Sequence, residues 1–217
     1  MPYDPLRDFT PIAMVANTPL MLAAAPGFPA ANLREMMAFA KAQPGKVSYA
    51  SSGIGTMQHM VGVLVEEQGR LDMVHVPYKG SSQVMPDLIA GRVSIMFNSV
   101  AALAPFVKDG RLKALAVSSP QRLPGWPEVP TMAESGLPGF EASAWYGVYG
   151  PARLPRPIVD RVQRELARIV ALPVSREKYA ALGLEPAAST PEALDAAMRK
   201  DLAKWSRIIK EKGIKPE

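Results

Sequence analysis

Two kinds of apolar pattern alternate along the first half of the chain. Short aliphatic runs predict strands at residues 12–15, 20–24, 47–50, 73–76, 93–97 and 114–117. Between them, apolar residues recur every three or four positions in stretches that begin near Asn32, Thr56, Ser81 or Ser82, and Val100, as they do in helices packed on a core. Strands that alternate with short helices predict parallel β-α-β units with right-handed crossovers, and therefore an α/β fold.

The pattern changes at Pro120. Residues 120–157 contain eight prolines and five glycines, which favours an extended crossing segment over a regular layer. Within this segment, Thr131 and Glu134 have the spacing of a capping box. Two longer helices follow, and we expect their apolar faces to be buried. These faces are Ile158, Val162, Leu166 and Ile169 in one helix, and Leu194, Met198, Leu202, Trp205 and Ile208 or Ile209 in the other.

The most distinctive junction joins the strand at 47–50 to the helix that begins at Thr56. Two glycines, Gly53 and Gly55, directly precede the first turn of this helix. Glycine lets the backbone turn sharply and approach a ligand, and the free N–H groups and dipole at a helix N-terminus favour an anion. We therefore predict a carboxylate or phosphate site here. The alternative is an ordinary tight turn that binds nothing.

Better-known glycine loops do not match this junction. A Walker A loop needs a Gly-Lys-Ser/Thr ending, and a dinucleotide loop needs a third glycine where Gln58 stands. The hydrolase elbow Gly-x-Ser-x-Gly is also absent, because Ser51 and Ser52 precede the glycines. The sequence therefore does not support a Walker A loop, a dinucleotide-binding loop or a hydrolase elbow at this junction.

Three polar loops follow strands that we predict to be parallel: residues 51–56, 78–80 and 98–99. In open parallel sheets, ligands bind beyond the carboxyl ends of the strands. We therefore expect the three loops to meet at one edge of the sheet and to form a site for a small ligand.

Composition limits the remaining possibilities. The chain has 217 residues, of which 48% are hydrophobic and 21% charged, as in folded globular proteins. It has no cysteine, which excludes disulfides, thiolate metal sites and a cysteine nucleophile. No apolar run has transmembrane length and no signal-peptide pattern follows Met1, so we expect a soluble chain without an export signal.

The net charge of +5 lies in the C-terminal part of the chain. Residues 151–217 carry 14 Lys/Arg and 9 Asp/Glu, whereas residues 1–150 carry 11 of each. Acidic residues alternate with the basic ones and no aromatic stacking platform lies among them, which favours a solvated helix face over a nucleic-acid or membrane surface.

Reactive chemistry has little support in the sequence. His59 and His75 are the only histidines, and neither has the companion ligands of a structural zinc site, so we predict no metal and no cofactor. His59 could face a ligand or serve in capping and packing, whereas His75 in an alternating strand favours a structural role. A hydrolase or lyase using Ser52, His59 or Lys79 stays open as an alternative, because geometry and not residue type defines such a site.

Ordered matches along nearly the whole chain carry a resemblance to one family. The matching motifs are Tyr3-Asp4-Pro5 with Asp8-Phe9, Ser48 to Thr56 with His59, His75 to Gly80, Asp87-Leu88 with Gly91, Ala114 to Val117, Pro130-Thr131 with Glu134 and Gly136, and Trp145-Tyr146-Gly147. The chain resembles the substrate-binding receptors of tripartite tricarboxylate transporters, the TctC or Bug family.

The resemblance implies a type II periplasmic-binding-protein fold, or Venus flytrap. Residues 17–122 would form a complete parallel-sheet domain 2, and residues 1–16 and 123–217 the remainder of domain 1. It implies a periplasmic receptor rather than an enzyme, which closes on a small organic acid and passes it to membrane transporter subunits, with no role for nucleic acid. The implied ligand-binding residues are Ser51, Ser52, Gly53, Ile54, Gly55, Thr56, His59, Tyr78, Lys79, Gly80 and Asn98.

The chain departs from the family pattern in two ways. Members have an export signal and first β-α units that do not precede Met1, so the chain resembles a receptor without its beginning, and a remnant or signalling partner that binds nothing is a further alternative. Asn98 stands where the family usually has an aspartate, and Phe106 where it often has a histidine. A neutral amide pairs less strongly with an ammonium group than a carboxylate does, so Asn98 favours dicarboxylates, hydroxy acids or aromatic carboxylates over amino acids.

Overall fold

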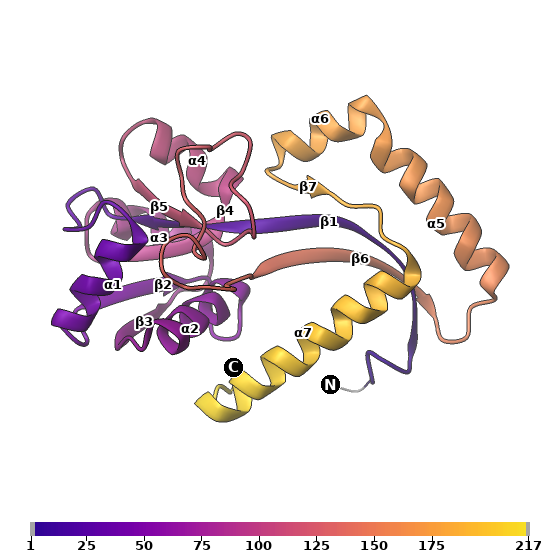
Figure 1. Cartoon of the computed structure of the whole chain (residues 1–217), viewed down its shortest axis with the longest axis horizontal. Helices are drawn as coiled ribbons and strands as arrows, with labels where there is room; N and C mark the ends of the chain where they lie inside the picture. The colour runs from indigo at the N-terminus through magenta and orange to yellow at the C-terminus, as the bar shows by residue number, and fades with distance from the viewer. Residues whose placement is uncertain (1–2, 216–217) are drawn as a thin grey trace. The chain divides into compact units, whose positions relative to one another are not determined.

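The structure is a computed structural model that describes residues 3–215 (Figure 1). Its contacts divide these residues into two compact units. Unit 1 comprises residues 3–18 and 144–212, and unit 2 comprises residues 19–143 and 213–215. The division into domains at residues 17 and 122 stays a prediction.

Unit 2 contains a five-stranded sheet in the order β3-β2-β4-β1-β5. The strands are β1 (Phe9–Ala24), β2 (Val47–Ser51), β3 (Met73–Pro77), β4 (Ile95–Ser99) and β5 (Lys113–Val117). β2 pairs in parallel with β3 and β4, which confirms the predicted parallel units for these three strands. The sheet is nevertheless mixed, because β1 lies antiparallel between β4 and β5. The α/β fold is confirmed, and the purely parallel sheet is corrected.

β1 is a single strand of 16 residues (Figure 1, indigo), and our prediction of two separate strands in this region was wrong. Pairing with β7 (Glu185–Pro186) ends at Asn17, and pairing with β4 starts at Leu20. Thr18 and Pro19 lie between the two ladders. Proline has no N–H to donate but is compatible with extended backbone, so it is tolerated at this changeover.

Four helices of unit 2 accompany its sheet: α1 (Leu33–Ala42), α2 (Met57–Gly69), α3 (Ser81–Ile89) and α4 (Val100–Lys108). α1 begins where Asn32 predicts, because the Asn32 side chain accepts a hydrogen bond from the Glu35 N–H. The core contains Tyr49, Phe97 and Leu103, each at most 1% exposed. Gly62 of α2 lies directly against the Tyr49 ring, where an added Cβ would be 2.2 Å from Tyr49 Cε2.

The capping box in the proline-rich segment forms as predicted. Thr131 Oγ1 accepts a hydrogen bond from the Glu134 N–H, and a Glu134 carboxylate oxygen accepts one from the Thr131 N–H. A turn rather than a helix follows it. The segment is attached to β5, because the Val117 N–H donates to the Pro130 carbonyl and the Met132 N–H donates to the Val117 carbonyl.

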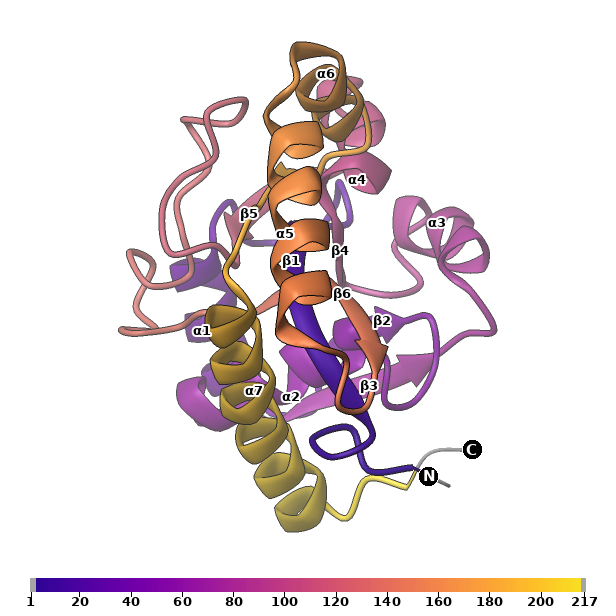
Figure 2. The same ribbon diagram turned by 90° about the vertical axis from the view of Figure 1, so that its right-hand side faces the viewer.

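Unit 1 contains the first part of β1, the strands β6 (Ser143–Pro151) and β7, and three helices. The helices are α5 (Arg156–Ala171), α6 (Pro173–Ala181) and α7 (Pro191–Lys212), of which α5 and α7 are the longest (Figure 2). β6 and β7 both pair with β1. α7 is tied to β6 by the Trp145 indole N–H, which donates to Asp201 Oδ2 at 2.7 Å.

The predicted apolar face of α5 was wrong at both of its ends. Ile158 and Ile169 are 48% and 46% exposed, whereas Val159 and Val170, each one residue later, are buried. Val162 and Leu166, between these ends, are half-buried, so the buried side of the helix is the edge of the apolar stripe that carries Val159 and Val170. In α7 the prediction was better, because Leu194 and Ile208 are fully buried, although Leu202 and Ile209 are exposed.

None of the helices within residues 3–215 is both long enough and apolar enough to span a bilayer.

Candidate functional site

The three predicted loops meet at one edge of the unit 2 sheet. β2, β3 and β4 are parallel, so their carboxyl ends lie at the same edge. The Tyr78 N–H donates to the Ser51 carbonyl at 3.0 Å, which joins the first loop to the second. Gln58 follows the first loop, and its Nε2 lies 3.4 Å from Ser81 Oγ, which follows the second loop. The same atom lies 3.4 Å from Asn98 Oδ1 in the third loop. The convergence is confirmed, and ligand binding by these residues stays a prediction.

The glycine loop adopts backbone conformations that glycine allows at low cost. Gly53 and Gly55 have φ of +136° and +78°. The Gly53 carbonyl accepts hydrogen bonds from Ser51 Oγ at 3.0 Å and from Thr56 Oγ1 at 2.7 Å. The Thr56 hydroxyl proton is therefore held inside the loop, and what Thr56 provides is the start of the helix.

Replacing Gly55 by valine is expected to destabilise unit 2 by about 1–3 kcal/mol, because a β-branched residue is strained at positive φ. An added Cβ would meet no atom within 4 Å, so the cost lies in the backbone conformation alone. Urea denaturation measures it. Gly80→Val is the matched control, since Gly80 is extended with φ of 161° and also has open space at its Cβ position. Equal losses in the two variants would contradict the argument from backbone conformation.

Two helices begin at this edge without a side chain that caps them. α2 starts after Thr56 and α3 after Gly80; neither has a side-chain cap or an acidic residue in its first turn among the described residues. By contrast, Asn32 caps α1 and Ser99 caps α4. The first N–H groups of a helix have no partner within the helix, and the helix dipole is positive there. The edge is therefore suited to an anion.

His59 and His75 stack on each other behind the glycine loop. Their ring centroids are 3.8 Å apart, and the Tyr49 ring lies 4.9 Å from that of His75. His59 Nδ1 accepts a hydrogen bond from the Gly55 N–H at 3.1 Å, so His59 holds the glycine loop, in line with the structural alternative that the sequence left open. His75 Nε2 lies 2.7 Å from Ser51 Oγ, so His75 holds the loop as well, a contact that the sequence did not reveal.

Both imidazoles are held neutral. Burial lowers the pKa of His59, and burial together with the nearby His59 lowers the pKa of His75 to about 4. A neutral His59 is also what its hydrogen bond requires, since a protonated Nδ1 cannot accept from the Gly55 N–H. Neither histidine supplies a positive charge to a ligand at neutral pH.

In the second loop, residues 78–80, the Tyr78 side chain is already hydrogen-bonded and the Lys79 side chain is exposed. The Tyr78 hydroxyl donates to Asp87 Oδ2 at 2.8 Å, and Asp87 also pairs with Arg92 at 2.7 Å. Burial, and then the bond to Asp87, raises the pKa of Tyr78. Lys79 is exposed, and Gly80 precedes the first turn of α3.

Gln58 is a site residue that the sequence analysis missed. It is the second residue of α2, and the Ser52 hydroxyl donates to its Oε1 at 3.0 Å. Its amide therefore contacts the first loop at Ser52, the third loop at Asn98, and Ser81, which directly follows the second loop. Its position in the sequence could have indicated this role. Side chains in the first turn of a helix that follows a glycine loop lie at the same sheet edge as the neighbouring loops.

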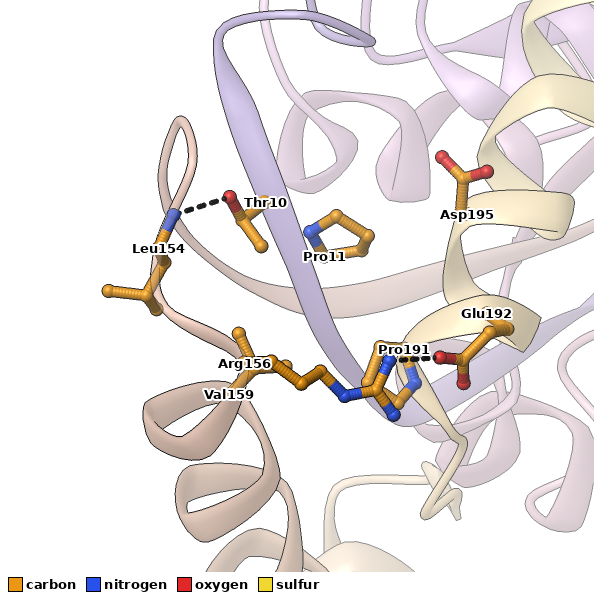
Figure 3. Close-up of a pocket in the computed structure, with 8 residues that line it drawn as sticks. All are labelled: Thr10, Pro11, Leu154, Arg156, Val159, Pro191, Glu192 and Asp195. Atoms are coloured by element: carbon orange, nitrogen blue, oxygen red, sulfur yellow. Dashed lines mark hydrogen bonds and ion pairs between the residues drawn. The ribbon is translucent and has the colours of Figure 1, made fainter.

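A separate cavity in unit 1, of about 290 Å³, has different chemistry (Figure 3). Arg156 contributes its only basic group, and its guanidinium is already paired with Glu192 at 2.6 Å and with Asp160 at 2.7 Å. Asp195 lines the same cavity, so carboxylates outnumber the cation there. This cavity does not suit an anion. No group of three or more potential metal-binding side chains occurs in the part of the chain that the structure describes.

Comparison with known proteins identifies the family. A family model described as tripartite tricarboxylate transporter family receptor matches residues 1–214. The chain belongs to this receptor family.

One relative in the family is the UPF0065 protein in the tcbD-tcbE intergenic region of Pseudomonas sp. strain P51. It is 37% identical over 212 residues, which are 97% of this chain and 63% of the relative. The chain thus spans less than two thirds of the length of that relative.

Two solved structures are similar to all or nearly all of the chain. R. palustris Rpa4515 with adipate has a TM-score of 0.84 and 29% identity, covering 100% of this chain and 73% of the other. MatC (Rpa3494) from Rhodopseudomonas palustris with bound malate has a TM-score of 0.78 and 27% identity, covering 96% and 72%. The structure of periplasmic binding protein BugD has a TM-score of 0.80 and 33% identity, covering 99% of this chain and 73% of the other, which confirms the periplasmic-binding-protein fold that the resemblance implied.

Proposed function

We propose that the chain acts as a periplasmic solute receptor that binds a small organic carboxylate at the edge formed by residues 51–56, 78–80 and 98. It delivers this acid to the membrane subunits of a tripartite tricarboxylate-type transporter. The observation that carries the proposal is the pair of helices, α2 and α3, that begin at one sheet edge with uncapped N-termini. Membership of the receptor family supports the transport role, and a similar periplasmic binding protein supports the location.

The ligand class that we propose is a dicarboxylate or hydroxy acid. Two similar proteins were solved with adipate and with malate, which are both dicarboxylates. Asn98 supports this class from the residues themselves. Its Oδ1 accepts the Ser99 N–H at 2.9 Å, so its carbonyl is already used and its NH₂ group is what remains. An NH₂ donor suits the oxygen atoms of an acid and not an ammonium group.

The alternative of a hydrolase or lyase finds less support in the geometry. The Ser52 hydroxyl donates to Gln58, and His59 Nδ1 accepts from the Gly55 N–H, so neither is arranged as nucleophile and base. Ser51 and His75 are close enough for such a pair, but Ser51 is fully buried and its hydroxyl also contacts Gly53. Lys79 is exposed.

Thermal denaturation with adipate, malate, succinate and aspartate tests the proposal. A saturable rise in melting temperature without consumption of the acid would support a receptor, because a ligand that binds only the folded state stabilises it. Product formation that Ser52→Ala abolishes would support the enzyme instead. No shift with any acid at millimolar concentration would favour a chain that binds none of them.

Replacing Asn98 by aspartate is expected to weaken malate binding by about tenfold or more, since an acceptor and a negative charge replace a donor. The same change should improve the binding of aspartate relative to malate. Isothermal calorimetry with both acids measures the two affinities. Gln68→Glu is the control: it makes the same amide-to-carboxylate change at an exposed position of α2. If the two variants change the malate and aspartate affinities to the same extent, Asn98 does not determine which ligand binds.

A further inference from the structure

The Gln58 side chain lies at the centre of the hydrogen bonds between the three loops. Its Oε1 accepts from the Ser52 hydroxyl at 3.0 Å, and its Nε2 faces Ser81 Oγ and Asn98 Oδ1 at 3.4 Å each. These three partners belong to the glycine loop, the start of α3 and the end of β4. A backbone hydrogen bond between Tyr78 and Ser51 joins the first two loops, whereas the contacts of residue 58 with Ser81 and Asn98 depend on its side chain.

A backbone group fixes the direction of both amides. The Ser99 N–H can only donate, and it points at Asn98 Oδ1 from 2.9 Å, so the carbonyl of Asn98 must lie there. The group of Gln58 that faces the same oxygen must then be its NH₂, which leaves Gln58 Oε1 for the Ser52 hydroxyl. Both carbonyl oxygens are therefore used inside the site.

The two NH₂ groups, by contrast, are weakly paired. Asn98 is only 7% exposed, yet Asn98 Nδ2 has only the Met96 sulfur, 4.0 Å away, as its acceptor among the described residues. The two contacts of Gln58 Nε2 are at the long end of the hydrogen-bond range. A buried amide donor with a poor acceptor gains from a better one, such as a carboxylate or hydroxyl oxygen.

We infer that Gln58 is the specificity-determining residue of the proposed carboxylate site. Together with Asn98 it presents neutral N–H donors, while both carbonyl oxygens are already hydrogen-bonded, which selects ligands that can place an acceptor atom there. Unsubstituted and hydroxyl-bearing dicarboxylates meet this condition, and α-amino acids, whose ammonium group needs an acceptor, do not. This inference rests on the proposed function, because it assigns the selectivity of that same site.

Calorimetry on the chain with malate and aspartate, two acids that differ by a hydroxyl against an ammonium group, tests the inference. Gln58→Met keeps the length of the side chain and removes its amide. It should weaken malate binding by about tenfold and narrow the preference for malate over aspartate. Gln58→Glu keeps an acceptor for Ser52 and replaces the NH₂ by an oxygen, so it should reverse the preference. Gln68→Met, at an exposed position of the same helix, should leave both affinities unchanged.

The ratio of the two affinities separates selectivity from stability, since partial unfolding lowers both affinities by the same factor. If Gln58→Met and Gln58→Glu weaken malate and aspartate equally, Gln58 is only structural; the inference is then overturned while the receptor function stands. If the unmodified chain binds neither acid nor adipate, the proposed function fails and the inference fails with it.

Discussion

Replacing Gly62 by alanine should destabilise the protein by about 1–3 kcal/mol, although the same change in most helix interiors is stabilising by about 0.5–1 kcal/mol. The added Cβ would lie 2.2 Å from Cε2 and 2.6 Å from Cδ2 of Tyr49. The Tyr49 ring is 1% exposed and cannot move into solvent. Overpacking therefore outweighs helix propensity at this position. Urea denaturation followed by circular dichroism measures the loss.

A double-mutant cycle isolates the cause. In a Tyr49→Ala background the space beside Gly62 is open, so Gly62→Ala should become neutral or stabilising there. Gly125→Ala serves as the control, because its Cβ would meet no atom within 4 Å. A loss that is the same in both backgrounds would show that Tyr49 does not explain it. Because Tyr49 also stacks on His75, we expect Gly62→Ala to weaken ligand binding as well.

Lowering the pH from 6.5 to about 4.5 is expected to cost the folded state about 1–2 kcal/mol through the two stacked histidines. Both pKa values are lowered by burial, that of His75 to about 4, whereas an unfolded histidine titrates near 6.5. In this window the unfolded chain binds protons that the folded chain does not, so stability falls as the pH falls. The lowered pKa of His75 would by itself correspond to a larger loss of folding free energy, but partial exposure of the ring to solvent reduces this loss.

The groups that face the two rings do not offset this loss. Tyr49 stacks on both imidazoles, its hydroxyl contacts Glu66 at 3.3 Å, and its pKa is raised, so it stays neutral. Ser51 is neutral as well. Protonation would also break the hydrogen bond from Gly55 to His59, so binding at the glycine loop should weaken over the same range.

Chemical denaturation at pH 7.0, 5.5 and 4.5 measures the pH effect. The double variant His59→Gln, His75→Gln should show a flatter dependence over this range. The carboxylates with lowered pKa values, such as Asp87 and Glu134, lose their contribution mainly below this window. An unchanged slope in the double variant would assign the dependence to other groups.

Local signals in the sequence predicted the parts of the fold that are local in the structure. Asn32 caps α1, and Thr131 and Glu134 form the capping box, because these bonds join residues three positions apart. The edge where the loops meet could also be predicted, since it follows from parallel strands alone. β1 was split because proline usually interrupts a strand, and nothing local shows that its two halves have different partners.

The details of the site depend on contacts between distant residues. The pairing of His75 with Ser51 and of Gln58 with Asn98 spans 24 and 40 residues. Residue type told us that Ser52 and His59 could be reactive, but not that both are engaged within the loop. The error in α5 has a similar origin: Ile158 and Ile169 lie beside Val159 and Val170 in one apolar stripe, and only the packing decides which edge of the stripe is buried.

The position of β1 in the sheet has a consequence for how the protein folds. Within the described residues, β1 pairs with β4, β5, β6 and β7, which lie up to about 170 residues further along the chain. The neighbouring β2, α2 and β3 form a compact local unit that can pair early. We therefore expect β1 to pair late in folding and to be an unpaired apolar segment until then. We expect a slow folding phase that ends with its insertion, and a tendency to aggregate before that step, which holdase chaperones would suppress.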